Sequence, residues 1–436
     1  SRPSDGTPAF LLGDSLSYWT LAQNLSRGDP YEYGSSDASV FRAPLYPLFL
    51  VPFAALNSVD FAVLAARLAG VGLSCLSIWF VIALAHRLAG FGAAASAGLV
   101  ASLHPGSIGM SVIVLSEALF MPLMMAALWN ASRAFDDSTR YRSASIGFGA
   151  CSGLAVLARP SWLLFIPFLG AVACILGPNR KHYLRVVMMG IVGFCAVMSP
   201  WWIRNASVTG HFVPTTLQVG LSLYDGLHEG ATGASDEGMN FAFDIQDEQR
   251  QLDLKTPPAE RAGTFEYRVD RLAKRKAIDW ATQHPGSVAS LAGRKFLRTW
   301  SLWPDGGDTG STAKRLAVTL GSFGILSLAI LGTILAIQRR RLGGPLSESS
   351  MQPDTKRDAA QLLANESTFA RSITWQLRIC WLPCLYFTLL HMVFVGSVRY
   401  REPAIVVLCV VAGIGLDQGI RWLVNLTRRS HPLRNS

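Results

Sequence analysis

Nine apolar stretches, separated by short polar segments, dominate the hydrophobic pattern of this chain. Roughly 17 to 25 residues of apolar helix are needed to cross the hydrocarbon of a bilayer. The stretches 91–103 and 146–158 are shorter and must borrow flanking residues to span it. The pattern predicts an all-α polytopic membrane protein with about nine transmembrane helices. The nine stretches are residues 61–85, 91–103, 110–131, 146–158, 161–176, 186–202, 316–337, 379–395 and 404–423.

Basic residues in the short loops indicate the orientation of the chain, because lysine and arginine accumulate on the cytoplasmic side of a membrane. When the C-terminal tail is placed inside and the helices alternate, all five basic segments fall in the cytoplasm. These segments carry Arg87; Arg133, Arg140 and Arg142; Arg180, Lys181 and Arg185; Arg339, Arg340 and Arg341; and Arg428, Arg429 and Arg434. Residues 1–60 then count as external, so we expect a signal-anchor or first transmembrane helix to precede this chain and bring the total to ten.

The same count predicts the domain organisation. Segment 44–56 would begin and end outside, which favours a juxtamembrane or re-entrant helix. In the large external loop, a break at His284-Pro285-Gly286 predicts one helix ending at Gln283 and an amphipathic helix after it. The predicted order is an external first loop with juxtamembrane helices (1–60), transmembrane helices (61–203), the large external loop (204–313), a transmembrane helix (314–337), a flexible cytoplasmic linker (338–378), transmembrane helices (379–423) and a cytoplasmic tail (424–436).

Composition agrees with a membrane protein, since half of the residues are hydrophobic, 16% are charged and the mean hydropathy is +0.31. The net charge of +10 comes largely from the predicted cytoplasmic arginines. We therefore interpret it as topology and contact with anionic membrane lipids, and we expect no nucleic-acid partner. All seven cysteines lie within apolar stretches, where a thiol behaves as a small hydrophobic group, so a disulfide framework is not expected.

Two carboxylates are candidates for chemistry at the outer face. Asp14 begins a short predicted helix and shares one of its faces with Tyr18. A helix N-cap is the alternative role for Asp14. Glu117 is flanked by apolar residues on both sides, where an ionisable group is energetically costly and usually functional. Its alternative role is stabilisation of the first turn of a helix by interaction with the helix dipole.

Several arginines also fall on the predicted outer side, where short loops normally contain few of them. Arg42 precedes Pro44 at the entry to the juxtamembrane helix, Arg159 separates two apolar stretches, and Arg399 and Arg401 precede the last stretch. Snorkelling toward lipid headgroups is the alternative for Arg42. An anionic partner held at the outer surface would account for all four arginines.

Six short motifs, in this order, resemble those of bacterial family 39 glycosyltransferases. That family belongs to the GT-C class, with protein O-mannosyltransferases and lipid A aminoarabinose transferases, and the resemblance covers nearly the whole chain. The motifs are Gly13-Asp14 with Tyr18 and Ala22, Arg42-x-Pro44-Leu-Tyr46-Pro47, Ser116-Glu117-x-Leu-Phe120, Gly153-Leu-Ala-x-Leu-Ala-Arg159-Pro160, Pro200-Trp-x-Ile-Arg204-Asn205 followed by Gly210-x-Phe-Val213-Pro214, and Arg399-Tyr-Arg401-x-Pro403.

The resemblance implies a GT-C-like fold and transfer of a sugar from a polyprenyl-phosphate donor to a lipid, glycan or protein acceptor. It further implies an inverting reaction at the periplasmic face of the bacterial inner membrane. Asp14 would be the general base, and Glu117 would organise the site or hold a divalent metal with Asp14. Many relatives have Asp-Glu where this chain has Asp14-Ser15, which counts against a metal. The donor phosphate would bind Arg42, Arg159, Arg399 and Arg401, and the candidate site-lining residues are Tyr18, Tyr46, His391 and Tyr400.

Other functions predict different patterns. A lipid-linked glycan ligase or polymerase would also need external arginines, but without an early helix carrying an aspartate. A non-enzymatic transporter would place ionisable residues near the bilayer midplane, often in inverted repeats. The candidate charges of this chain instead lie at one predicted edge of the membrane, which favours the enzyme.

Overall fold

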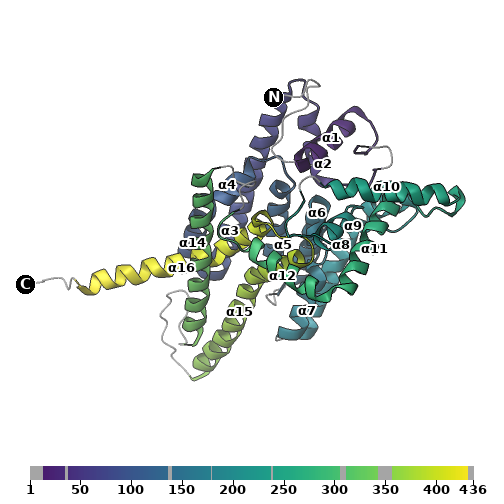
Figure 1. Ribbon diagram of the computed structural model, residues 1–436. Helices are drawn as coiled ribbons and strands as arrows, with labels where there is room; N and C mark the ends of the chain where they lie inside the picture. Colours follow the sequence, from purple (N-terminus) through teal and green to yellow (C-terminus); the bar gives the residue numbers. More distant parts are fainter. Residues whose placement is uncertain are drawn as a thin grey trace, which may run out of the picture.

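The structure is a computed structural model that describes residues 13–34, 38–135, 140–177, 179–236, 239–304, 311–341 and 356–430. Within those ranges the regular elements are all helical. Five helices there are long and apolar enough to cross a membrane, which makes the chain an integral membrane protein (Figure 1). They are α3 (Val59–Leu103), α8 (Arg180–Thr209), α14 (Thr312–Arg341), α15 (Lys356–Val393) and α16 (Val398–Ser430).

Most of each predicted stretch lies in a helix, although the helices do not always have the predicted bounds. Helix α3 covers the first two stretches and is interrupted at Gly90, whose φ of 80° is accessible to glycine and unfavourable for other residues. The third stretch does not start a helix at Met110. It is divided between the short α4 (Pro105–Ser111) and α5 (Glu117–Phe135), so that Glu117 begins a helix. The fourth and fifth stretches form α6 (Tyr141–Ala158), and η1 (Pro160–Trp162) with α7 (Phe165–Leu176).

The first half of helix α16 lies inside the bundle, and its C-terminal end extends away from it (Figure 1). Helix α16 packs against α3, α14 and α15, while α6 packs against α5 and α8 (Figure 1). From Ala404 to Ala412 every side chain of α16 is buried. This part of the last predicted stretch is apolar on all faces, as expected for a helix surrounded by other helices, whereas Asp417 and Arg421 lie beyond it.

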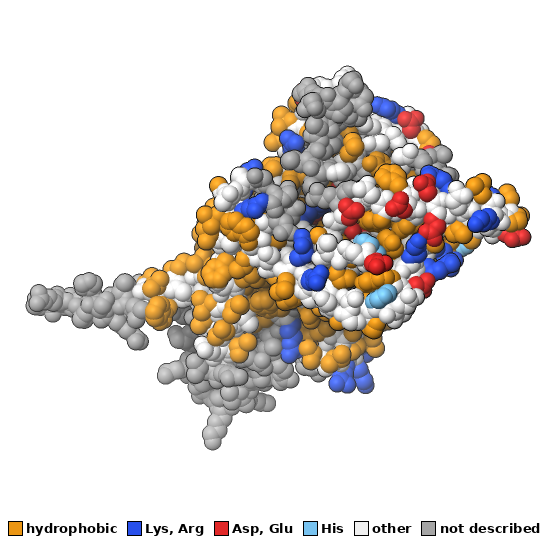
Figure 2. All heavy atoms as spheres, in the orientation of Figure 1, with side chains coloured by type: hydrophobic (Ala, Val, Ile, Leu, Met, Phe, Trp, Pro, Cys, Tyr) orange, Lys and Arg blue, Asp and Glu red, His pale blue; other side chains and the backbone are white. Residues whose placement is uncertain are grey.

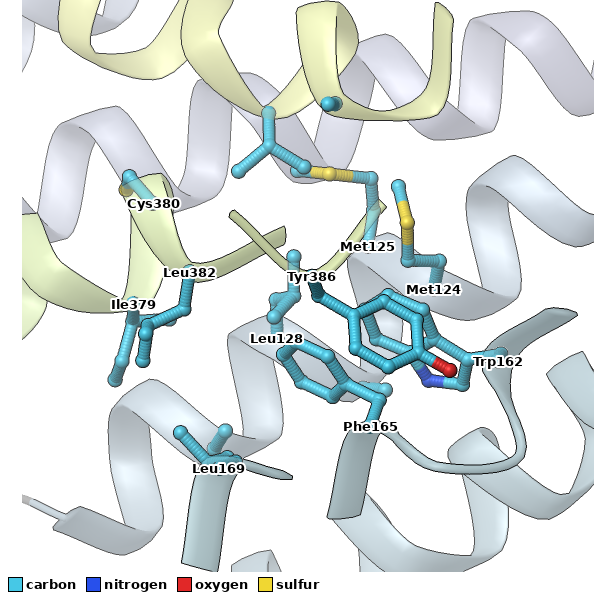
Figure 3. Packing of buried hydrophobic residues seen from close by; sticks show 14 of the residues in the cluster. Met124, Met125, Leu128, Trp162, Phe165, Leu169, Ile379, Cys380, Leu382 and Tyr386 are labelled. Carbon is cyan, nitrogen blue, oxygen red and sulfur yellow. The ribbon is translucent and has the colours of Figure 1, made fainter. Parts of the chain in front are cut away.

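An aromatic cluster fixes the chain just after α6. The rings of Trp162 and Phe165 stack at a centroid distance of 3.8 Å, and Tyr386 of α15 meets both edge-on (Figure 3). The Tyr386 hydroxyl donates to the carbonyl of Ser161 at 2.6 Å and accepts from the backbone amide of Leu164 at 3.2 Å. The core therefore determines where the polypeptide leaves α6, immediately after Arg159.

The segments predicted as external form short helices. The first contains α1 (Gly13–Arg27) and α2 (Leu45–Ala54), which pack on one another. Helix α2 has ten residues, too few to cross a bilayer, as predicted for segment 44–56. The second contains α9 (Val219–Gly226), α10 (Asn240–Lys255), η2 (Pro258–Glu260), α11 (Phe265–Gln283) and α12 (Pro285–Thr299). The predicted helix end at Gln283 is confirmed, because α11 ends at that residue.

Two predicted borders differ from the structure. Helix α8 continues to Thr209, past the border expected at residue 203, and α15 begins at Lys356, inside the expected flexible linker. Charged side chains gather over α10 and α11, whereas hydrophobic side chains dominate over α14 and the neighbouring part of α16 (Figure 2). This separation is expected when one part of a molecule faces water and another faces lipid.

Candidate active site

Asp14 lies in the first turn of α1 and is bound by two arginines from distant parts of the chain. Arg42 donates from Nη2 to Asp14 Oδ1 at 2.7 Å, and Arg399 donates from Nη2 to Asp14 Oδ2 at 3.2 Å. The Asp14 side chain retains 36% of its exposure, so a ligand can reach it. Both carboxylate oxygens of Asp14 take part in ion pairs.

Glu117 is the buried partner of the same cluster, with 1% of its side chain exposed. Its Oε1 accepts from Arg159 Nη1 at 2.6 Å and from Arg399 Nε at 2.6 Å. The Ser116 hydroxyl donates to its other oxygen at 3.3 Å. Arg399 therefore bridges Asp14 and Glu117, and the two carboxylates share one guanidinium.

Each cation reaches the cluster from the end of a helix or from a loop. Arg42 lies in the loop before α2, Arg159 follows the last residue of α6, and Arg399 is the second residue of α16. The backbone of Arg159 is extended, with φ −148° and ψ 111°, and Pro160 follows it, so α6 ends there. Helix ends are where side chains from separate helices can converge on one site without disrupting the packing of the bundle.

Arg42 has two further partners that the sequence did not indicate. Its Nε donates to Ser17 Oγ at 2.9 Å, and its Nη1 donates to Gln218 Oε1 at 2.9 Å. Ser17 could have been found, since it lies one helical turn after Asp14. Gln218 carried no local signal, because it comes from the large external loop and approaches only through the tertiary fold.

The candidate aromatic residues surround the cluster. Tyr18 donates to Ser116 Oγ at 3.2 Å, and its ring lies 5.1 Å from the guanidinium carbon of Arg42. Tyr46 packs edge-on against Tyr18 at 5.1 Å and is buried. The two rings thus form an aromatic wall beside Arg42 of the cluster.

Tyr400 forms a second aromatic contact, because the guanidinium carbons of Arg159 and Arg399 lie 5.5 and 5.8 Å from its ring centre. His391 stacks on this ring at a centroid distance of 4.5 Å, with an interplanar angle of 6°, and its Nδ1 lies 3.0 Å from the Val395 carbonyl. His391 therefore packs against Tyr400, which in turn contacts two arginines of the cluster.

The structure does not bring Arg401 to this cluster. Its side chain is fully buried and donates to the carbonyl of Ser301, just after α12, and to Ser322 Oγ of α14 at 3.3 Å. These contacts fasten the end of α12 to the bundle. Of the four predicted phosphate-binding arginines, Arg42, Arg159 and Arg399 converge and Arg401 does not.

The cluster carries more positive than negative charge, with three guanidinium groups facing two carboxylates. Burial acts to raise the pKa of Asp14, but the positive charges of Arg42 and Arg399 outweigh it and hold the pKa below its ordinary value. Asp14 is therefore ionised at neutral pH. The surplus of one positive charge gives the cluster an affinity for an anion.

A divalent metal held by Asp14 and Glu117 does not fit these contacts. Hard cations require about six or more oxygen ligands, whereas here guanidinium groups occupy both carboxylates. In the parts of the chain that the structure describes, no group of three or more His, Cys, Asp or Glu side chains could hold a metal ion.

The described part of the chain is a helical integral membrane protein whose fold is similar to that of a solved oligosaccharyltransferase. The oligosaccharyltransferase AglB from Archaeoglobus fulgidus, solved with an inhibitory peptide and a dolichol-phosphate, aligns with a TM-score of 0.50 at 13% identity. The alignment covers 98% of this chain and 48% of AglB, so the chain spans about half of that protein.

ArnT from Cupriavidus metallidurans also aligns, over 86% of this chain in both of its structures. The apo structure gives a TM-score of 0.39 at 16% identity over 72% of ArnT, and the structure bound to undecaprenyl phosphate gives 0.40 at 15% over 73%. No protein-family model matches the sequence of this chain, and no curated protein matches it.

Proposed function

We propose that the protein is a GT-C glycosyltransferase, similar to family 39, that moves a sugar from a polyprenyl-phosphate donor to an acceptor at the outer face of the inner membrane. The observation that carries this proposal is the convergence of Arg42, Arg159 and Arg399 on Asp14 and Glu117. Such an arrangement combines a site for a phosphate with a carboxylate that can accept a proton. The GT-C fold shared with AglB, which was solved with dolichol-phosphate, supports the same donor chemistry.

The charge of the cluster suits the leaving group of this reaction. A polyprenyl-phosphate sugar has a phosphodiester with one negative charge, and cleavage of the bond to the sugar leaves a phosphomonoester that carries more charge. Guanidinium groups placed in advance stabilise charge that develops in the transition state. Arg159 and Arg399 are suited to this task, because 14% and 19% of their side chains remain exposed while Glu117 holds them in position.

Asp14 is proposed as the general base. The acceptor oxygen or nitrogen attacks the anomeric carbon, the bond from that carbon to the phosphate oxygen breaks, and the proton of the acceptor passes to Asp14. A single displacement of this kind inverts the anomeric configuration. The exposed fraction of Asp14 and its ionised state satisfy two requirements of a base, which are access to the acceptor and an unprotonated carboxylate.

The rival functions make different demands on the same residues. A transporter would need the charged cluster to bind and release its cargo, but it would need no base. A lipid-linked glycan ligase or polymerase would use the arginines on a pyrophosphate carrier. The pairing of a partly exposed carboxylate with a phosphate-sized group of arginines favours the monophosphate-dependent transferase.

Substitution Asp14→Asn tests the proposal. Membranes from cells that lack the protein would be supplemented with purified wild type or variant, and envelope glycans would be compared by mass spectrometry. We expect wild type to restore a sugar-bearing product and Asp14→Asn to lose at least about a hundredfold in rate. The control is Asp29→Asn, an exposed acidic residue just beyond α1. Transfer at the wild-type rate by Asp14→Asn would overturn the role of Asp14.

A further inference from the structure

A cavity of about 470 Å³ lies between α11 and the loop that follows α8. Its volume falls within the range of roughly 300 to 1,000 Å³ that is common for small-molecule sites. One wall is loop 212–219, and the other is the face of α11 that carries Tyr267, Arg271, Lys274 and Arg275. The four α11 residues take no part in the carboxylate and arginine cluster described above, whereas Gln218 of the loop contacts Arg42 of that cluster.

Side chains at the end of α8 hold the loop wall in place. Trp201 donates from Nε1 to the Thr215 carbonyl at 2.7 Å, and Trp202 donates to the Pro214 carbonyl at 2.9 Å. Asn205 donates to the carbonyls of Val213 and Thr215 at 3.1 and 3.2 Å. These contacts give a structural role to the motif that runs from Pro200 to Pro214, and they make the cavity wall preformed.

The other side of this loop contacts the catalytic cluster. Gln218 accepts from Arg42 at 2.9 Å, as described above, and the Leu217 amide donates to the Val40 carbonyl at 2.9 Å. Glu266 of α11 accepts from the Val40 amide at 3.0 Å. The cavity and the Arg42 end of the cluster are therefore separated by the thickness of one loop.

The cavity has a mixed but positive lining. Arg271, Lys274 and Arg275 are exposed, and Asp270 and Asp279 of the same helix also line the cavity. Asp270 is already occupied, because it accepts from the Gly220 amide at 2.6 Å. Three cations with exposed ends suit an anionic group, and the remaining carboxylate of Asp279 can accept hydrogen bonds from hydroxyl groups. A ligand that carries both features is an acidic saccharide.

We propose that this cavity binds the acidic, phosphate- or carboxylate-bearing saccharide portion of the acceptor and thereby presents the acceptor to Asp14. The inference rests on the proposed function, which supplies the donor at the neighbouring cluster. It assigns acceptor choice to Arg271, Lys274 and Arg275, residues that do not touch the reacting atoms.

The test uses purified protein in phosphatidylcholine nanodiscs, with envelope extract from cells lacking the protein as the source of donor and acceptor. The variant is the triple substitution Arg271→Gln, Lys274→Gln and Arg275→Gln. We expect the extract concentration at half-maximal rate to rise at least about tenfold, while the maximal rate and the binding of undecaprenyl phosphate change less than about twofold. The charge-conserving triple Arg271→Lys, Lys274→Arg and Arg275→Lys should restore most of the loss.

Lys276→Gln is the matched control, because Lys276 follows Arg275 on the same helix, pairs with Glu248 and does not line the cavity. The inference would be overturned if the glutamine triple variant reached its half-maximal rate at the same extract concentration as wild type. So would a defect that appears only when phosphatidylglycerol is added to the nanodiscs, because the cavity would then hold a lipid headgroup. Failure of the proposed function is distinguished by Asp14→Asn, which would then transfer at the wild-type rate in the same extract.

Discussion

Arg399 and Glu117 lie 282 positions apart in the chain, yet Arg399 Nε donates to Glu117 Oε1 at 2.6 Å. The contact joins the first residue of α5 to the first turn of α16. Through its Nη2, the same guanidinium also reaches Asp14 of α1. One side chain thus fixes the relative positions of a buried carboxylate and a partly exposed one, and the site depends on its planar, forked shape.

Replacing Arg399 by lysine should therefore impair the enzyme although the charge is retained. An ammonium group is a point charge and cannot donate in two fixed directions to Glu117 and Asp14. We expect Arg399→Lys to lower the maximal rate of transfer at least about tenfold, and Arg399→Gln to lower it further. The comparison is with Arg294→Lys, an exposed position on α12. Equal rates for Arg399→Lys and wild type would show that the bridge is not needed.

Substitution Asp14→Asn should change donor binding and transfer in opposite directions. The substitution removes the negative charge and one of the two accepting oxygens, so Arg42 and Arg399 are held less tightly and can bind a phosphate better. We expect the dissociation constant of undecaprenyl phosphate, measured in nanodiscs, to fall severalfold while transfer is lost. A loss of both binding and transfer would mean that Asp14 orients the arginines and is not primarily a base.

Much of this site could be predicted from the sequence, because unusual residue types stand out in an apolar background. Asp14, Arg42, Glu117, Arg159 and Arg399 were all recognisable as charges at the predicted outer edge, and they converge. Arg401 was grouped with Arg399 because both are external arginines of one motif. Residues that are two positions apart on a helix point in directions about 200° apart around its axis. The side chains of Arg399 and Arg401 therefore leave α16 in nearly opposite directions.

Other parts of the structure had no local signal. Gln218 joins the site only through the fold of the large external loop, and it belongs to none of the six motifs. The expected flexible linker was judged from its polar composition, which it shares with exposed helices. Its second half contains alanine, leucine, glutamine and arginine, all good helix formers, and α15 begins there at Lys356.

Glu266 predicts a pH dependence of stability. Burial is the main cause that raises its pKa to about 8, from an ordinary value of 4.5, with the nearby Asp270 adding to the effect. The folded state therefore binds this proton more tightly than the unfolded state, so the contribution to stability is complete below pH 4.5 and is lost as the pH rises through about 8. We expect the thermal unfolding midpoint of wild type to fall between pH 5 and 8.

The variant Glu266→Gln removes this titration but retains an oxygen that can accept from the Val40 amide. Its unfolding midpoint should fall less over the same pH range, and the difference between the two proteins should grow with pH. Asp14 does not produce this effect, since its pKa is lowered and its contribution is lost only under more acidic conditions. Parallel curves for wild type and Glu266→Gln would contradict the assignment.

The packing of α6 against α8 depends on glycine. A Cβ added at Gly149 would lie 1.7 Å from the Gly190 carbonyl oxygen, which is part of the backbone and cannot rotate away. Substitution Gly149→Ala must therefore separate the two helices, and we expect it to destabilise the protein by about 1–3 kcal/mol or more. Gly72→Ala is the control, because Gly72 is an exposed helical position with no atom within 4 Å of the added Cβ. We expect Gly149→Ala to lower the thermal unfolding midpoint and Gly72→Ala to leave it unchanged or raise it. Equal decreases in both variants would contradict a specific contact between α6 and α8.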